Sequence, residues 1–193
     1  MTPHPAISNE PAASVEDNAG ESDPARTCAA VSIIDERWHS ATGLTELIPE
    51  LVATSLLKVQ LAPEAHLVSI ALLSDDDIQE LNRTFRGKDR STNVLSFPPA
   101  PGVGTLDNED GRCHLGDIAL AYETVAEEAQ AQEKTITQHA AHLVVHGILH
   151  LAGFGHENGA DAECMENAER RILLRFGIAD PYGDDDLLPL SAH

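Results

Sequence analysis

The sequence contains few basic residues. Only 12 Lys and Arg stand against 32 Asp and Glu, which gives a formal net charge of -20 at pH 7. This balance excludes a protein that coats nucleic acid through a broad basic surface. A polyanion that this chain binds must therefore be held locally, and we expect no DNA partner.

Long apolar runs are also missing. The longest clean run spans 67–73 and contains Ser69, so it falls far short of the roughly 18 to 20 apolar residues that cross a bilayer. We therefore expect no membrane partner. The first 27 residues have neither a basic nor an apolar signal region, which predicts a cytoplasmic protein.

Cysteine is scarce, whereas histidine is concentrated in one segment. The three cysteines are far apart and form no CxxC pair, which excludes a disulfide framework and a thiolate zinc site. Five of the ten histidines lie between positions 139 and 156. We expect the functional site in this segment.

The composition predicts one globular domain with two irregular ends. A chain of 193 residues that is 42% hydrophobic can bury a real core. Residues 1–27 are mostly small, polar or acidic, which predicts a disordered acidic N-terminal extension. Residues 28–180 form the expected globular domain, and residues 181–193, rich in Pro, Gly and Asp, are expected to be an irregular C-terminal tail.

The pattern of apolar residues predicts an α+β fold. We expect strands at 30–34, 67–73, 93–97 and 116–121, and helices at 44–59, 75 to about 83, 122 to about 132, 138–153 and 159–176. The segment 101–111 contains Gly and Pro and is expected to be a loop. The result is a small mixed sheet of about four strands packed against helices, with a central buried helix that carries histidines.

The histidine segment has the spacing of a metal site. His146 and His150 are four residues apart and share one face of the helix expected at 138–153. Gly153 allows the helix to end in a left-handed turn, after which His156 can return as a third ligand. Three converging imidazoles suit one tetrahedral Zn²⁺ ion with a fourth position open for water.

The motif HxxxHxxGxxH also occurs in metzincin peptidases. Those enzymes carry a Glu directly after the first His, and it acts as the general base. Gly147 occupies that position here. A metzincin-like zinc peptidase that lacks the usual Glu therefore remains the weaker alternative.

His142 lies one turn before His146 on the same stripe, and His139 lies three residues earlier. Each histidine has three interpretations: support for a ligand, contact with substrate, or an ordinary helix residue. We favour the ordinary interpretation for both, and more strongly for His139.

The segment LNRTFRGKDRSTNVLSFPP carries a cluster of basic residues that we place mostly in a loop. The cluster consists of Arg83, Arg86, Lys88 and Arg90. Arginine offers a planar fork that matches phosphate oxygens, so the cluster could contact a polyanionic substrate. A solvated turn whose charges pair with nearby acids is equally compatible with the composition.

Three segments carry a resemblance to a known family. They occur in the order LNRTFRGKDRSTNVLSFP, LGDIAL and HLVVHGILHLAGFGH. Together they resemble the YbeY family, bacterial single-strand-specific endoribonucleases that act as rRNA maturation factors. The resemblance covers about residues 30–180. The chain differs from many members at Ser91, Asn93 and Gly155, none of which is an expected ligand.

That resemblance implies a zinc-dependent RNA hydrolase that acts in rRNA maturation, notably 16S rRNA 3′ end processing, and in ribosome quality control. It implies His146, His150 and His156 as ligands of one Zn²⁺ ion, and Arg86 as the catalytic arginine. Single-stranded ribosomal RNA and the ribosome or its small subunit are the implied partners.

A non-catalytic alternative also remains. The domain would then bind the ribosome or an assembly factor, and the zinc would be structural. Structural zinc sites usually have four protein ligands, whereas this sequence offers three at convincing spacing. This count favours catalysis.

Overall fold

The computed structural model describes residues 28–100, 111–155 and 159–183. The expected extension at 1–27, most of the expected loop at 101–111 and most of the expected tail at 181–193 lie outside these ranges. His156 also lies outside them. In the described part of the chain, no helix combines the length and apolar character needed to cross a membrane.

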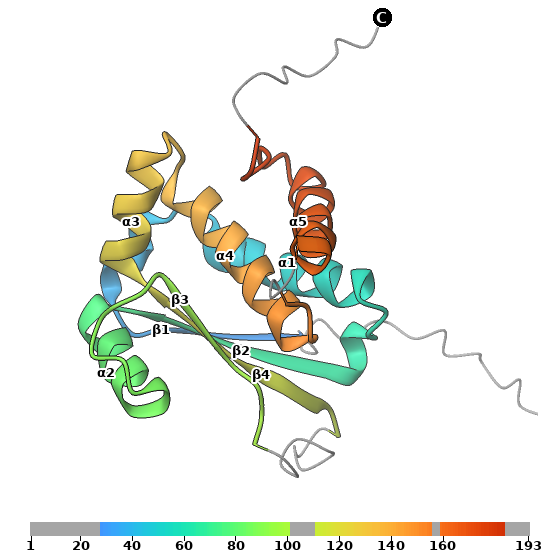
Figure 1. Cartoon of the computed structure of the whole chain (residues 1–193), viewed down its shortest axis with the longest axis horizontal. Helices are drawn as coiled ribbons and strands as arrows, with labels where there is room; N and C mark the ends of the chain where they lie inside the picture. Colours follow the sequence, from blue (N-terminus) through green and yellow to red (C-terminus); the bar gives the residue numbers. More distant parts are fainter. Residues whose placement is uncertain (1–27, 101–110, 156–158, 184–193) are drawn as a thin grey trace, which may run out of the picture.

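Four strands form one mixed sheet (Figure 1). In spatial order they are β1 (Ala29–Ile33), β2 (His66–Leu73), β4 (Cys113–Ala121) and β3 (Val94–Phe97). The first three strands are parallel, and β3 is an antiparallel edge strand paired with β4. The predicted α+β class with a small mixed sheet is confirmed.

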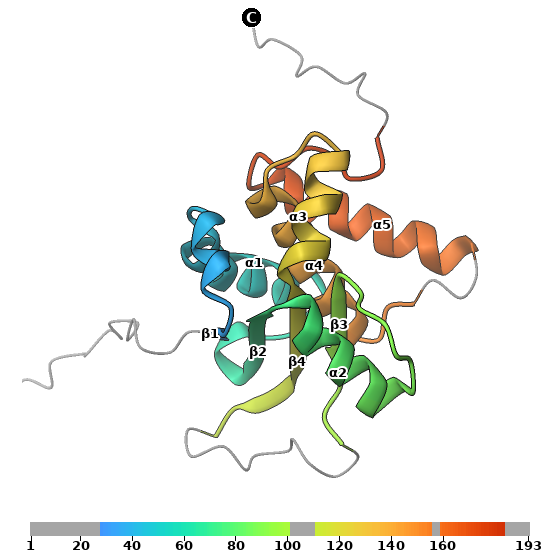
Figure 2. The ribbon, with the colours of Figure 1, turned by 90° about the vertical axis from the view of Figure 1, so that its left-hand side faces the viewer.

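Helices lie on both faces of the sheet. The described residues form α1 (Leu44–Lys58), α2 (Asp75–Arg86), α3 (Tyr122–Ala131), α4 (Ile136–Leu151) and α5 (Gly159–Leu174), and two short 3-10 helices at Glu36–Ser40 and Pro63–Ala65. Helices α1 and α4 pack on one face, and α5 packs against α1 and α4 (Figure 1). Helix α2 covers part of the opposite face (Figure 2).

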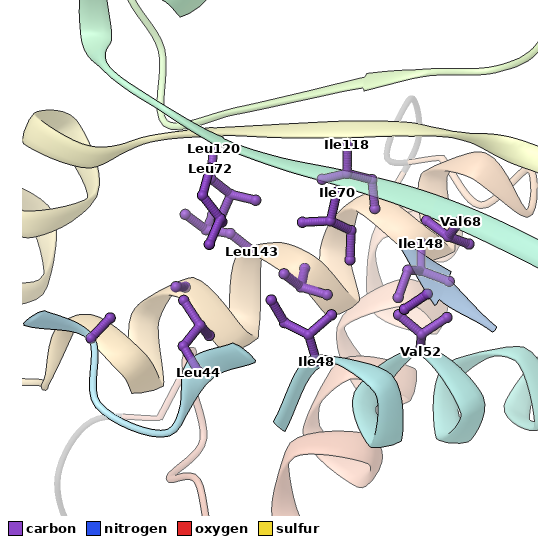
Figure 3. Packing of buried hydrophobic residues seen from close by; sticks show 14 of the residues in the cluster. Leu44, Ile48, Val52, Val68, Ile70, Leu72, Ile118, Leu120, Leu143 and Ile148 are labelled. Carbon is purple, nitrogen blue, oxygen red and sulfur yellow. The ribbon is translucent and has the colours of Figure 1, made fainter. Parts of the chain in front are cut away.

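The main core lies between the sheet and the pair α1 and α4. Alternate residues of β2, including Val68, Ile70 and Leu72, point towards these helices, and each is at most 1% exposed (Figure 3). They meet Ile48 of α1 and Ile148 of α4, as the strand period of two requires. This packing fixes α4 against the sheet, next to the edge strand β3.

Helix α4 has defined signals at both ends. The Thr135 side chain accepts a hydrogen bond from the Gln138 N–H, and the Gln138 side chain accepts one from the Thr135 N–H, which forms a capping box. After the helix, Gly153 has a φ of 89°, the left-handed conformation that the sequence predicts. Most residues of this helix are buried, and it contacts the sheet, α1, α3 and α5, so the histidine helix is central and mostly buried, as expected.

Helix α2 is longer than the sequence pattern indicates. The sequence pattern places the end of this helix near Arg83 and most of the basic cluster in a loop. In the structure the helix continues to Arg86. Gly87 ends it in a left-handed conformation, and the Gly87 N–H bonds the Arg83 carbonyl. Arg86 therefore belongs to the last turn of the helix, where a basic side chain interacts favourably with the helix dipole, and the loop assignment is wrong for this residue.

Gly116 allows β4 to approach both β3 and the end of α4 closely. It lies at a register shift between β2 and β4 and has a φ of 143°. A Cβ at this position would lie 2.5 Å from the Phe97 carbonyl oxygen and 2.7 Å from Leu151 Cδ2. Only glycine fits here without displacing β3 or the end of α4.

Replacement of Gly116 by Ala should lower the free energy of unfolding by about 3 kcal/mol, because a strained φ and overpacking each cost about 1 to 3 kcal/mol. Urea unfolding of purified protein measures this change. Gly87→Ala is the matched control, since Gly87 also has a positive φ but a Cβ there meets nothing within 4 Å. Equal losses in the two variants would contradict the predicted clash.

Candidate functional site

His146 and His150 lie side by side on the half-buried stripe of α4. Their Nε2 atoms are 3.0 Å apart and their ring centroids are 4.5 Å apart. Two nitrogens on a tetrahedral zinc ion, each about 2.0 to 2.1 Å from the metal, are about 3.3 Å apart. The pair is therefore spaced to ligate one ion.

The outer nitrogens of both rings fix how the pair is protonated. His146 Nδ1 lies 2.9 Å from Glu169 Oε1, and His150 Nδ1 lies 3.0 Å from the Phe154 carbonyl oxygen. Because a carboxylate and a carbonyl can only accept, both Nδ1 atoms carry protons and donate. When both rings carry their proton on Nδ1 alone, the two Nε2 lone pairs converge, which is the arrangement that a cation between them would satisfy. These residues fit a metal ion.

The third predicted ligand cannot be placed, because His156 lies outside the described residues. Among the residues that the structure does describe, no group of three or more His, Cys, Asp and Glu has the arrangement of a metal site. The assignment of His156, and of one Zn²⁺ ion to the three histidines, stays a prediction.

Sequence reasoning missed Glu169, which lies directly behind the histidines. Its side chain is fully buried, and it accepts hydrogen bonds from His146, from His142 at 3.3 Å and from the Tyr182 hydroxyl. Burial raises the pKa of Glu169, but the bonds from the two histidines and the tyrosine outweigh it and lower the pKa to about 2. Glu169 is therefore an ionised group that orients His146.

A signal for Glu169 exists in the sequence. Met165, Ala168 and Ile172 form a buried stripe on α5, and the acid occupies a position on that same stripe. A carboxylate at a core position of an amphipathic helix needs a partner. The partner is 23 residues away along the chain, so only the fold identifies it.

The chain after α5 returns to the site. Arg170 Nε bonds both carboxylate oxygens of Asp180, at 3.0 and 3.1 Å, and Asp180 also accepts a bond from the Tyr182 N–H. The Arg170 guanidinium lies over the Tyr182 ring, 5.1 Å from its centroid. These contacts hold the Tyr182 hydroxyl at Glu169 although residues 181–183 belong to no helix or strand.

Arg86 shares a cavity with the two histidines. The cavity has a volume of about 400 Å³ and is lined by Arg86, Asn93, Val94, Ser96, Pro98, His146, His150 and Leu151. Arg86 Nη2 donates to the Ser96 carbonyl oxygen at 3.1 Å. A guanidinium has five N–H donors, so this one bond leaves capacity for a phosphate oxygen in the cavity.

The other members of the basic cluster lie elsewhere. Arg83, Lys88 and Arg90 are exposed, and none of them lines the cavity of Arg86. Arg83 pairs with Glu80 at 2.8 Å, which matches the solvated alternative for that residue. The structure therefore brings one of the four basic residues to the histidine pair.

The first turn of α2 is fixed to α3. Both the N–H and the hydroxyl of Thr124 donate to the Asp75 carboxylate, at 3.0 and 2.6 Å. The Asp75 N–H in turn donates to Glu123 at 2.9 Å. These reciprocal bonds, together with the bond from Arg86 to Ser96, fix α2 at its two ends.

Gly147 leaves no room for the base of a metzincin. A Cβ at this position would lie 2.9 Å from Ile118 Cδ1 and 3.0 Å from Ser96 Oγ, because α4 packs closely on the sheet here. A Glu side chain would be directed into this packing. The peptidase alternative therefore lacks both its carboxylate and the space for one.

The two remaining histidines of α4 contact acids. His139 is 4% exposed, and its Nε2 lies 2.7 Å from Glu128 Oε2. Burial lowers the pKa of His139 from its usual value, although Glu128 acts in the opposite direction. His142 contacts Glu169, so it lies behind His146.

Replacement of Glu169 by Gln should change how stability depends on pH. The pKa of Glu169 is depressed, so ionisation of its carboxylate stabilises the folded state above pH 4.5, and this stabilisation is lost as the pH falls towards 2. We expect the variant to lose at most about 3 kcal/mol at neutral pH and to show a shallower decline under acid.

Urea unfolding at a series of pH values measures both effects. Glu163→Gln is the control, because Glu163 lies on the same helix with an exposed side chain. If Glu169→Gln and Glu163→Gln gave the same pH profile, the assigned role of the buried carboxylate would be wrong.

Comparison with known proteins identifies the family of this chain. The family model described as endoribonuclease YbeY matches residues 32–177. An endoribonuclease YbeY of Nitrobacter hamburgensis is 40% identical over 163 residues, which cover 84% of this chain and 86% of that protein. One of Rhodopseudomonas palustris is 42% identical over 162 residues, 84% of each chain. The solution structure of TM1509 from Thermotoga maritima is 26% identical, covers 81% of this chain and 99% of its own, and has a TM-score of 0.47. The chain belongs to the endoribonuclease YbeY family.

Proposed function

We propose that this protein is a zinc-dependent endoribonuclease that cleaves single-stranded RNA by phosphodiester hydrolysis. Its family makes RNA cleavage the expected reaction. One observation carries the proposal of a metal-assisted mechanism: the Nε2 atoms of His146 and His150 converge in the same cavity as the Arg86 guanidinium. The cavity therefore combines two metal-ligand nitrogens with a phosphate-binding fork.

The proposed substrate is ribosomal RNA, notably the 3′ end of 16S rRNA, and the proposed roles are rRNA maturation and ribosome quality control. The resemblance of the three sequence segments to the family supports this choice. The proposed partners are single-stranded ribosomal RNA and the ribosome or its small subunit. Since these are found in the cytoplasm, we propose that the protein acts there.

In the proposed mechanism, His146, His150 and His156 hold the zinc ion. A bound Zn²⁺ ion supplies Lewis acidity, which activates water or polarises an oxygen of the scissile phosphodiester. Arg86 binds the phosphate and offsets the negative charge that develops in the transition state. Glu169 keeps the proton of His146 on Nδ1, so that Nε2 presents its lone pair to the metal.

Replacement of Arg86 by Ala should reduce RNA cleavage by about 100-fold or more, because it removes an aligned charged donor. Zinc content should be unchanged, since Arg86 holds no metal. Cleavage of a labelled single-stranded RNA and the metal content of the protein measure the two quantities. Arg83→Ala is the control, because it removes an arginine one turn earlier that does not line the cavity. Wild-type cleavage by Arg86→Ala would refute this role.

Replacement of His150 by Ala should abolish both zinc binding and RNA cleavage, because two remaining ligands hold the ion poorly. Metal analysis after dialysis against a weak chelator measures the loss, and His39→Ala, which changes an exposed histidine, is the control. Full zinc occupancy in His150→Ala would place the metal elsewhere.

Single-stranded RNA, duplex RNA and an unstructured peptide test the class of reaction. Cleavage of the single-stranded RNA alone supports the proposal. Cleavage of the peptide favours the metzincin-like alternative. A zinc-loaded protein that binds the small ribosomal subunit and cleaves none of the three favours the non-catalytic alternative.

A further inference from the structure

A second cavity adjoins His146 and is not lined by Arg86. We call it the distal cavity; it has a volume of about 400 Å³, and its lining includes His139, His142, Glu128, Gln132, Pro181 and Tyr182. Asn93, Val94 and His146 line both this cavity and the one that contains Arg86. The two cavities therefore share a wall, and His146 lies where they meet.

The two cavities differ in charge. The first contains the Arg86 guanidinium. The described residues that line the distal cavity include no Lys or Arg, and they include the Glu128 carboxylate. Asn93 Nδ2 donates to Glu128 at 2.9 Å, and His139 lies against it at 2.7 Å, so this acid is held in place. The lining of the distal cavity therefore offers no ammonium or guanidinium to a phosphate, and it suits an uncharged group instead.

The walls of the distal cavity suit a flat ring with polar edges. Tyr182 is 41% exposed and its ring lies edge-on to that of His142, with centroids 5.7 Å apart. Leu143 and Val94 add apolar surface, and the Glu128 carboxylate can accept hydrogen bonds from amino or imino groups. Nucleobases offer an apolar face and such donors, and proteins that read single-stranded RNA pack them against aromatic side chains.

We propose that the distal cavity binds the nucleobase of a nucleotide next to the scissile phosphate. This inference rests on the proposed function, because it places the phosphate at His146, His150 and Arg86. A base can enter the cavity only when it is neither paired nor stacked in a duplex. The cavity therefore supplies a physical reason for a preference for single strands.

The experiment uses RNA oligonucleotides with one abasic ribose at each position around the cleavage site. For the wild-type enzyme, one position next to the scissile phosphate should lower kcat/KM by about 10-fold when its base is missing, and the other positions should have little effect. In Tyr182→Ala this penalty should nearly disappear, because the aromatic wall is gone. In Tyr182→Phe it should persist, because the ring remains.

The phenylalanine variant separates two roles of Tyr182. It removes the hydroxyl that bonds Glu169 and keeps the ring of this cavity-lining residue. Any loss of zinc or of basal activity shared by Tyr182→Ala and Tyr182→Phe therefore reports on Glu169, whereas a change in the abasic penalty in Tyr182→Ala alone reports on base contact. The same abasic penalty in wild type and Tyr182→Ala would overturn the inference.

Binding provides a readout that does not need cleavage. Fluorescence anisotropy with the Arg86→Ala variant, which should cleave slowly, gives the Kd of each abasic oligonucleotide with and without Tyr182→Ala. Loss of affinity at one position, dependent on the Tyr182 ring, supports the distal cavity as a base site. No positional effect on Kd overturns it. Absence of RNA cleavage by wild type overturns the proposed function and leaves this binding result to decide the base site separately.

Discussion

Helix α4 can carry its histidines along the edge of the sheet only because its backbone approaches the strands closely at Gly147. The side chains of Ile118 and Ser96 occupy the space that a larger residue would need. On its other side, α4 is held by α1 and α5. The sides of α4 that face the sheet, α1 and α5 are therefore buried. The remaining stripe, with His146 and His150, lines the cavities beside β3.

Much of the fold could be predicted from local patterns. Apolar residues in β2, in the second half of β4 and in α4 form the main core, and the sequence predicts each of these elements. The pairing of His146 with His150 follows from helical geometry alone, since residues four apart share a face. The sequence pattern places the end of α2 too early, because it does not distinguish Gly87 as the left-handed cap of the helix from a glycine in a basic loop.

The contacts behind the histidines could not be predicted, because they depend on tertiary packing. Glu169 and Tyr182 come from α5 and the chain that follows it, and the sequence does not indicate which residues of α4 they meet. The resemblance to the family singles out Arg86, but it does not show where this side chain lies. Its place in one cavity with His150 depends on how α2 packs across the sheet. Position along the chain therefore indicates candidate ligands but not the groups that orient them.

Residues far from the cavity influence the position of Arg86, because they attach the other end of α2. Twelve residues of helix span about 18 Å, and the bonds of Asp75 to Thr124 are at one end while the guanidinium of Arg86 is at the other. If the helix moves as a rigid body, a small tilt at Asp75 produces a larger displacement at Arg86. Natural variation at Thr124 would alter the reach of the arginine without touching any group in the cavity.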